Sequence, residues 1–160
     1  MAEIISINKI NSLCDRLKKQ DRVVVLAGGC FDVLHPGHVT FLEKAKKAGD
    51  ILVVLLESDE KIKTIKGVNR PVHTQSERAK VLSALAPIDY IVKLPYFKKD
   101  LEYDRLISKI KPGVIAATSK IKNIRHYRRA AQLAGAKLKF VTKTIGSYST
   151  SSLIGSIAVQ

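Results

Sequence analysis

The sequence contains only two cysteines, Cys14 and Cys30, which are too few for a framework of disulfides. Aromatic residues make up only 6% of the 160 residues, so the chain lacks the interleaved aromatic side chains on which single-stranded nucleic acids stack. No apolar run approaches the length that crosses a bilayer, and the N-terminus lacks the basic-then-apolar pattern of a secretory signal. These absences predict a globular cytoplasmic protein with reduced thiols and without a membrane partner.

Acidic residues are also scarce, because 14 Asp and Glu stand against 28 Lys and Arg, for a formal net charge of +14. Such an excess suits nucleic-acid binding, or a solvated basic surface around a site for multiply charged anions. We favour the second interpretation, because the basic residues are spread along the chain. The densest basic segment comprises Lys120, Lys122, Arg125, Arg128 and Arg129. This segment suits a triphosphate, an acidic partner or solvent alone.

Apolar runs typical of strands alternate along the chain with helical periodicities. Strands are expected at 23–27, 51–56, 88–94, 114–117 and 137–141. Helices are expected at 7–19, from 36 to Gly49, at 59–65, 75–85, 100–110 and 121–134, and a last helix is expected to begin at Ser149 or Thr150. The alternation predicts an α/β fold, a Rossmann-like, doubly wound parallel sheet of five strands with helices on both faces.

We expect one domain over 1–160, with an N-terminal helix in 1–21 and the Rossmann-like core in 22–160. Ser6 and a capping box, Thr74-x-x-Glu77, are expected to begin helices, and Gly49 and Gly135 to end them. In doubly wound sheets the ligand binds beyond the carboxyl ends of the strands, where the strand order reverses. Loops that follow the strands are therefore expected to converge on one site.

A glycine-rich segment with two histidines follows the first expected core strand. Residues 28–38 are Gly-Gly-Cys-Phe-Asp-Val-Leu-His-Pro-Gly-His. Glycines let the backbone approach an anion closely, and the start of a helix offers free N–H groups and a positive dipole end. Two imidazoles three residues apart also suit helix capping or half of a metal site. The combination behind a strand favours a phosphate cradle, with His35 and His38 as donors to phosphate oxygens.

The pattern Gly-x-Phe-Asp-x-x-His-x-Gly-His, over residues 29–38, resembles the signature of the cytidylyltransferase-like nucleotidyltransferases, the HIGH-motif group of the HUP-type fold. The chain is most similar to the adenylyltransferase domain of bacterial ADP-heptose synthesis, and glycerol-3-phosphate cytidylyltransferases share the same skeleton. The likeness to the heptose-type domain rests on a short helix before the first strand and on Gly49-Asp50, Lys66-Gly67, Arg70-Pro71-Val72, Glu77-Arg78 and the segment 149–152.

The resemblance implies in-line attack by an acceptor phosphate oxygen on the α-phosphorus of a nucleoside triphosphate, with pyrophosphate leaving and Mg²⁺ arriving with the nucleotide. It implies catalytic roles for His35, His38 and Lys66, and no metal ligand from the protein. The expected nucleotide-binding residues are Gly28, Gly29, Cys30, Phe31, Gly37, Arg78, Lys120, Ser149, Thr150 and Ser151. The expected acceptor-binding residues are Asp32, Lys63 and Lys66.

Simpler roles stay open for several of these residues. Lys63 also suits an exposed lysine, Arg78 a surface ion pair, and the hydroxyls of 149–151 plain helix capping. Asp32 also suits a role in ordering the glycine loop through backbone hydrogen bonds rather than metal binding.

One segment departs from the family pattern. Related enzymes carry Gly-Asp and a basic residue after the fourth strand, whereas this chain has Ala116-Ala117-Thr118-Ser119-Lys120. Lys120 or Lys122 retains the basic element.

We expect transfer of AMP from ATP to a small phosphorylated acceptor such as a sugar 1-phosphate. A cytidylyltransferase acting on a polyol phosphate or phosphoalcohol, and a nucleotide-binding regulatory protein with little turnover, are the alternatives. Nucleic acid is not an expected partner, and a homodimer is left open.

Overall fold

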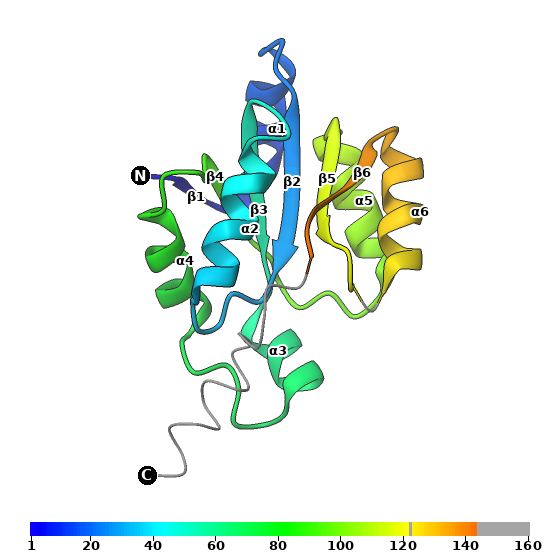
Figure 1. Cartoon of the computed structure of the whole chain (residues 1–160). Helices are drawn as coiled ribbons and strands as arrows, with labels where there is room; N and C mark the ends of the chain where they lie inside the picture. The colour runs from blue at the N-terminus through cyan, green and yellow to red at the C-terminus, as the bar shows by residue number, and fades with distance from the viewer. Residues whose placement is uncertain (122, 144–160) are drawn as a thin grey trace.

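The computed structural model describes residues 1–121 and 123–143, in which six parallel strands form one sheet in the order β1-β4-β3-β2-β5-β6 (Figure 1). The strands are β1 (Glu3–Ser6), β2 (Val24–Gly29), β3 (Ile51–Leu56), β4 (Tyr90–Lys93), β5 (Val114–Thr118) and β6 (Lys137–Thr142). The α/β, Rossmann-like class is confirmed, whereas the expected number of five strands is wrong by one.

The additional strand is β1, which pairs with β4 at the edge of the sheet from Glu3↔Tyr90 to Ser6↔Lys93. Only Ile5 of its four residues is buried, so the segment lacks the apolar run that identifies a core strand. Ser6 precedes a 3₁₀ turn, η1 (Ile7–Lys9), and its side chain makes no capping hydrogen bond. The α-helix α1 (Ile10–Lys18) therefore begins later than the sequence predicts.

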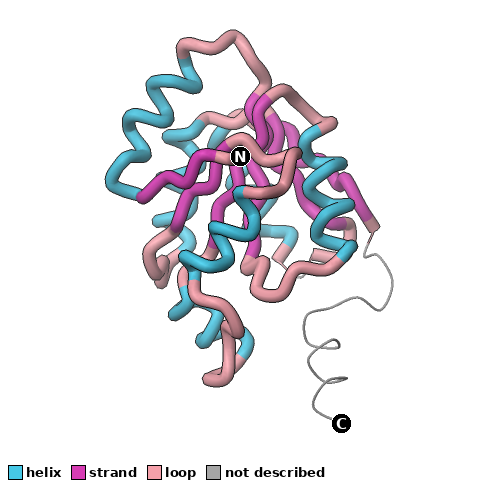
Figure 2. The backbone as a smooth tube through the Cα atoms, turned by 90° about the vertical axis from the view of Figure 1, so that its left-hand side faces the viewer, coloured by secondary structure: helices cyan, strands magenta, loops and turns pink. Residues whose placement is uncertain are grey.

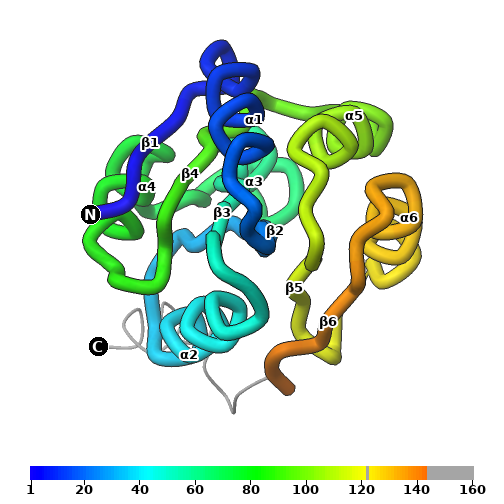
Figure 3. The backbone as a smooth tube through the Cα atoms, turned by 90° about the horizontal axis from the view of Figure 1, so that it is seen from above, coloured from blue at the N-terminus to red at the C-terminus, as the bar shows by residue number. Residues whose placement is uncertain are grey.

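Helices cover both faces of the sheet, as Figure 3 shows from above. On one face lie α1, α5 (Asp100–Ile110) and α6 (Ile124–Ala134), and on the other lie α2 (Pro36–Lys46) and α4 (Gln75–Ser83). The side chains of β3 alternate between the two cores, with Ile51, Val53 and Leu55 in one and the intervening residues in the other. Its continuous apolar run is thus explained by burial on both faces.

Local helix signals are largely confirmed. The Thr74 hydroxyl accepts from the Glu77 amide, and the Glu77 carboxylate accepts from the Thr74 amide at 2.8 Å, which completes the capping box. Gly135 ends α6 with a φ of 67°, a left-handed conformation that favours glycine.

Gly49 has a different role from the expected one, because α2 ends at Lys46. A Cβ at Gly49 would lie 2.8 Å from the Val23 carbonyl oxygen, so close backbone approach requires glycine there.

The carboxyl ends of the strands meet at the lower end of the molecule in Figure 1, where α3 (Asp59–Lys66) follows β3. Figure 2 shows that α3 and the loop after it extend beyond the sheet at this end. From β2 the chain first builds outward to β3 and β4, and later returns to add β5 on the other side of β2. The strand order therefore reverses beside β2, and this is the expected ligand position. None of the described helices is long and apolar enough to cross a membrane.

Candidate active site

The glycine loop at the end of β2 folds tightly around Phe31. The backbone of Phe31 is left-handed, with a φ of 44°, and its buried ring packs against the loop. A Cβ on Gly29 would lie 2.8 Å from the Phe31 ring, so this position requires glycine. The aromatic ring points into the core, and the backbone of Gly28, Gly29 and Cys30 lines the cavities on either side. Backbone at this position can therefore approach a ligand closely.

His35 and His38 lie together at the start of α2. His35 is the N-cap residue, Pro36 occupies the first turn, and the two imidazoles stack with their centroids 3.8 Å apart. A Cβ on Gly37 would lie 3.0 Å from the His35 ring, which is why a glycine separates the pair. The two imidazoles thus lie beside the free N–H groups at the N-terminus of α2.

Burial keeps both imidazoles in the neutral form at pH 7. It lowers the pKa of His38 to about 4, and repulsion from a protonated His35 and from Lys66 acts in the same direction. Burial and the Lys66 charge also lower the pKa of His35. The Nδ1 atom of His38 is buried and has no hydrogen-bond partner among the described residues. Each neutral ring offers one N–H donor, so the pair suits hydrogen bonding to an oxyanion without carrying charge.

A cavity of about 250 Å³, here called the histidine cavity, lies beside these groups. It brings together half of the residues that the sequence predicts for nucleotide binding, and adds residues from β5, α6 and the end of β6. Its lining comprises Gly28, Gly29, Cys30, Phe31, His35, Gly37, His38, Phe41, Ala116, Ala117, Thr118, Ile121, Tyr127, Thr142 and Lys143. The segment that departs from the family pattern therefore contributes, from the end of β5, two small side chains and one hydroxyl to this cavity.

A second cavity, of about 340 Å³ and here called the Glu57 cavity, lies on the other side of the glycine loop among α3, α5 and α6. It shares Gly28, Gly29, Cys30 and Tyr127 with the histidine cavity. Its polar lining includes Glu57, Lys61 and Tyr103. A ligand of two parts therefore has room on both sides of one loop.

The predicted lysines lie around the site rather than in its lining. Lys63 and Lys66 are exposed in the last turn of α3, and the Lys66 charge acts on both histidines. Lys120 is exposed after β5 and lines neither cavity. Contacts of Lys66 and Lys120 with phosphate remain predictions, as do contacts of Lys63 with the acceptor.

Some predicted residues lie outside the described part of the chain. These are Lys122, Ser149, Thr150 and Ser151, together with the expected last helix.

Asp32 holds a distant loop instead of the glycine loop. Its buried carboxylate accepts from Arg70 Nε at 2.6 Å and from the backbone amides of Val72 and His73. Burial alone would raise the pKa of Asp32, but these hydrogen bonds lower it overall. The expected ordering of the glycine loop is therefore corrected, because the backbone hydrogen bonds go to residues 72 and 73. A carboxylate so engaged is poorly placed to bind the acceptor directly.

The structure contradicts a phosphate-binding role for Arg78. The guanidinium is completely buried and donates to the carbonyls of Cys30, Glu57 and His73 and to Asp59 Oδ1. These bonds use four of the five N–H donors of the buried guanidinium within the protein. Arg78 instead joins the ends of β2 and β3 to the start of α4.

The polar cavity residues that sequence reasoning missed include Glu57, Tyr103, Tyr127 and Lys143. Glu57 directly follows β3 and Lys143 directly follows β6. A polar residue at the carboxyl end of a parallel strand is a signal that could have identified both as site residues. Burial raises the pKa of Glu57, and burial together with the Glu57 carboxylate raises the pKa of Tyr103. The two tyrosines lie on α5 and α6, where only folding brings them to the glycine loop.

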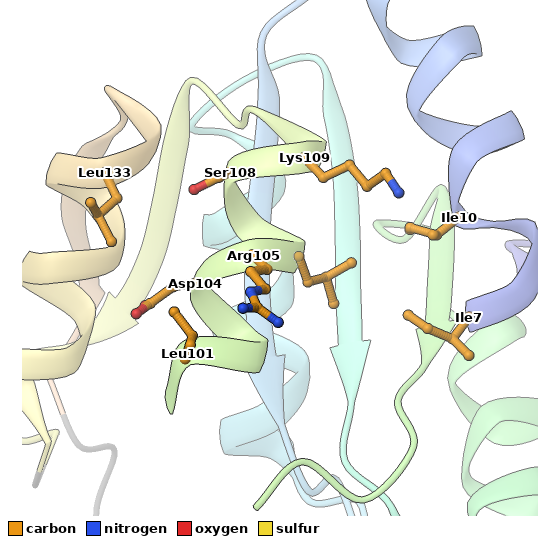
Figure 4. A pocket seen from close by; sticks show the side chains of 9 residues that line it. Ile7, Ile10, Leu101, Asp104, Arg105, Ser108, Lys109 and Leu133 are labelled. Atoms are coloured by element: carbon orange, nitrogen blue, oxygen red, sulfur yellow. The ribbon is translucent and has the colours of Figure 1, made fainter. Parts of the chain in front are cut away.

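The structure also has a larger, open hollow of about 680 Å³ between α1, α5 and α6 (Figure 4). Its lining includes Ile7, Ile10, Leu101, Arg105 and Leu133, and none of the glycine-loop or histidine residues. The candidate active site is therefore the pair of cavities at the glycine loop. Among residues 1–121 and 123–143, no three His, Cys, Asp or Glu side chains are arranged to hold a metal ion.

Comparisons with known proteins agree with this geometry. The family model described as Cytidylyltransferase-like matches residues 26–155. The bifunctional protein HldE of Wolinella succinogenes is 41% identical over 112 residues, or 70% of this chain and 23% of the relative. HldE of Helicobacter pylori is 36% identical over 151 residues, or 92% of this chain and 30% of the relative. The chain thus spans less than a third of the length of these relatives.

Two solved structures are also similar. The lipopolysaccharide core biosynthesis protein of Thermoplasma volcanium has a TM-score of 0.62 and 26% identity, over 80% of this chain and 99% of that one. Pantoate-beta-alanine ligase of Francisella tularensis has a TM-score of 0.59 over 89% of this chain and 67% of that one, and its 15% identity shows a shared fold alone. Because the family model covers most of the sequence, the chain belongs to the cytidylyltransferase-like family, as its Gly-x-Phe-Asp-x-x-His-x-Gly-His motif predicts.

Proposed function

We propose that the chain is a nucleotidyltransferase that moves AMP from ATP to a sugar 1-phosphate and releases pyrophosphate. The observation that carries this proposal is the neutral, stacked His35–His38 pair at the start of α2, beside the glycine loop. An anion placed there meets imidazole and backbone N–H donors together. Such a cradle suits the charge that develops on a phosphorus centre under attack.

In the proposed reaction, an oxygen of the acceptor phosphate forms a bond to the α-phosphorus of ATP. The bond from that phosphorus to the oxygen bridging it to the β-phosphorus breaks, and both electrons leave with pyrophosphate. The acceptor phosphate is already a nucleophile, so the chain has to position two anions and stabilise negative charge. His35 and His38 donate to phosphate oxygens, and Lys66 at the end of α3 adds positive charge.

We prefer adenine over cytosine because the chain is similar to the HldE relatives and resembles the adenylyltransferase domain of ADP-heptose synthesis. No single residue of the sequence identifies the base. The phosphates of the nucleotide would carry Mg²⁺, which neutralises part of their charge. We place the reaction in the cytoplasm.

A second candidate is a nucleotide-binding regulatory protein with little turnover. The observation that favours it is the end of β5, where Ala116, Ala117 and Thr118 line the histidine cavity in place of the acidic family pattern. A missing carboxylate removes one hydrogen-bond acceptor for the base without removing the phosphate cradle.

A pyrophosphate-release assay separates these functions. The purified chain is incubated with Mg²⁺ and either ATP or CTP, and with a heptose 1-phosphate, glycerol 3-phosphate or phosphocholine as acceptor. We expect release with ATP and the sugar phosphate. Release with CTP alone would identify a cytidylyltransferase, and calorimetric binding of ATP without release from any pair would identify the regulatory alternative.

A further inference from the structure

The Glu57 cavity contains a carboxylate whose position is fixed but whose hydrogen-bonding capacity is largely unused. The Glu57 amide donates to the Gly29 carbonyl at 3.1 Å, and the Glu57 carbonyl accepts from buried Arg78 at 2.8 Å. The backbone is thus held from both sides at the junction of β2 and β3. Its side chain lines the cavity next to the glycine loop, where the two cavities meet.

The carboxylate itself has a single hydrogen-bonding partner among the described side chains. The Tyr103 hydroxyl lies 3.0 Å from each of the two oxygens, so one proton is shared between them. The nearby ammonium of Lys61 donates instead to the Phe97 carbonyl at 3.0 Å. An ionised carboxylate accepts about four hydrogen bonds, so most of its capacity remains available.

The Asp, His and Arg side chains at this cavity that lie on α5 and α6 already bind one another. His126 lies 2.8 Å from Asp100, and Arg129 lies 2.7 Å from Asp104, so these pairs join α6 to α5 across the rim. No described Lys, Arg or His comes into ion-pair contact with Glu57. Shielding a carboxylate from water is costly, and burial raises the pKa of Glu57 although the Tyr103 hydroxyl and the charges of Lys61 and Arg78 act in the opposite direction. A ligand that supplies donors would offset this cost.

Two classes of donor fit a carboxylate, an ammonium group and a set of hydroxyls. Lys61 lies in the cavity lining, and its charge acts on the Glu57 carboxylate, so it repels a second ammonium group beside this carboxylate. Hydroxyl groups donate to Glu57 without adding charge, and they accept from the remaining N–H groups of Lys61. A volume of about 340 Å³ accommodates a single sugar ring. The chemistry therefore favours a neutral polyhydroxylated group.

We propose that Glu57 is a specificity-determining residue that accepts hydrogen bonds from hydroxyl groups of the acceptor sugar in the Glu57 cavity. This inference rests on the proposed function, because it assumes that the acceptor phosphate reacts at the shared glycine loop. Tyr103 orients the carboxylate, and Lys61 donates to the same ligand. Polyhydroxylated phosphates are thereby distinguished from phosphates on an apolar or cationic group.

The test compares two phosphates that differ in their hydroxyl groups. Heptose 1-phosphate and cyclohexyl phosphate both carry a six-membered ring, but the second has no hydroxyls. Calorimetric binding in the presence of a non-hydrolysable ATP analogue is measured for the wild type, Glu57→Gln, Glu57→Leu and the control Glu60→Gln on exposed α3. We expect the wild type and the control to prefer the sugar phosphate. Affinity for it falls about 10-fold in Glu57→Gln and about 100-fold in Glu57→Leu, with cyclohexyl phosphate unaffected.

Turnover provides the second measurement and separates the two proposals. The KM for the sugar phosphate should rise in the Glu57 variants, while the KM for ATP stays unchanged. A wild type that binds the sugar phosphate preferentially but releases no pyrophosphate overturns the proposed function alone. A wild type that binds both phosphates equally, or Glu57 variants that keep the preference, overturns the role of Glu57. Thermal unfolding verifies that each variant is folded. The comparison of the two phosphates on the wild type tests the proposal even if a variant does not fold.

Discussion

The central residues of the site are two histidines that the protein keeps uncharged. His35 and His38 stack at 3.8 Å, so protonating either one places a positive charge against its neighbour. Burial adds to this penalty, as the low pKa of His38 shows. We therefore expect the pair to bind phosphate through directed hydrogen bonds, with nearby positive charge from Lys66.

We expect His35→Ala and His38→Ala each to lower kcat by about 10²-fold or more, because each removes a donor to phosphate oxygens. Pyrophosphate release at saturating ATP and acceptor measures the change, and circular dichroism verifies the fold. His73→Ala is the matched control, since its exposed side chain lines neither cavity. Near wild-type kcat in either site variant would refute the assigned chemistry.

Stability should depend on pH through the same histidines. The pKa of His38 is about 4 in the folded protein, against an ordinary value of 6.5. The unfolded chain therefore binds more protons between these values, and stability falls as the pH drops through this window. We expect the wild type to lose about 2 kcal/mol more than His38→Gln between pH 7 and pH 4.5 in urea unfolding. Parallel pH profiles for the two proteins would contradict the buried, neutral His38.

At the scale of elements, Arg78 joins the segments that form the cradle. It extends from α4 to the carbonyls of Cys30 after β2 and Glu57 after β3, and it pairs with Asp59 at the start of α3. Arg78 thus holds the end of β2 next to the end of β3. The loops that follow these strands carry the functional groups of the site. The sequence predicts that Arg78 binds the nucleotide, whereas in the structure its side chain joins the loops around the site.

Arg78→Ala should destabilise the fold by about 3 kcal/mol, because it leaves buried carbonyls and the Asp59 carboxylate without a partner. Arg78→Lys should recover only part of this loss, since an ammonium group cannot reproduce the planar fork. Urea unfolding measures both, with Arg125→Ala on exposed α6 as control. Equal stability of Arg78→Ala and the control, together with a specific loss of ATP affinity, would restore the phosphate-binding role.

At the scale of the whole molecule, part of the excess positive charge lies at the end of the sheet where we propose that anions bind. Lys66 and Lys143 lie at the carboxyl ends of the strands, near the histidine pair or in the lining of its cavity. On α6, Arg129 contacts Asp104 at 2.7 Å, so the basic segment is partly neutralised. Arg125 and Arg128 are exposed on the same helix.

We expect binding to duplex DNA or RNA to be weak and to vanish near 0.15 M salt, because scattered lysines supply only counterion release. A gel-shift series over salt concentration measures this. A double variant, Arg125→Glu with Arg128→Glu, should weaken the residual binding at low salt. Sub-micromolar binding that survives physiological salt would reveal a nucleic-acid partner, and we expect none.

The sequence by itself determined the features that depend on neighbours along the chain. The strand 51–56 and the helix 100–110 have the predicted bounds, because an apolar run and a helical period are local patterns. The Thr74–Glu77 capping box is confirmed for the same reason. The glycine loop and the histidine pair are likewise encoded within eleven consecutive residues, 28–38.

Only the tertiary structure decided which distant groups meet. β1 becomes a strand because β4 offers it a free edge, and its own sequence carries too short an apolar pattern. Asp32 bonds to an amide 40 residues away, and Glu57 to a hydroxyl 46 residues away. Arg78 is buried because three chain segments close around it. Burial and hydrogen bonding of a side chain depend on what folding packs against it, and no local pattern of residues contains that information.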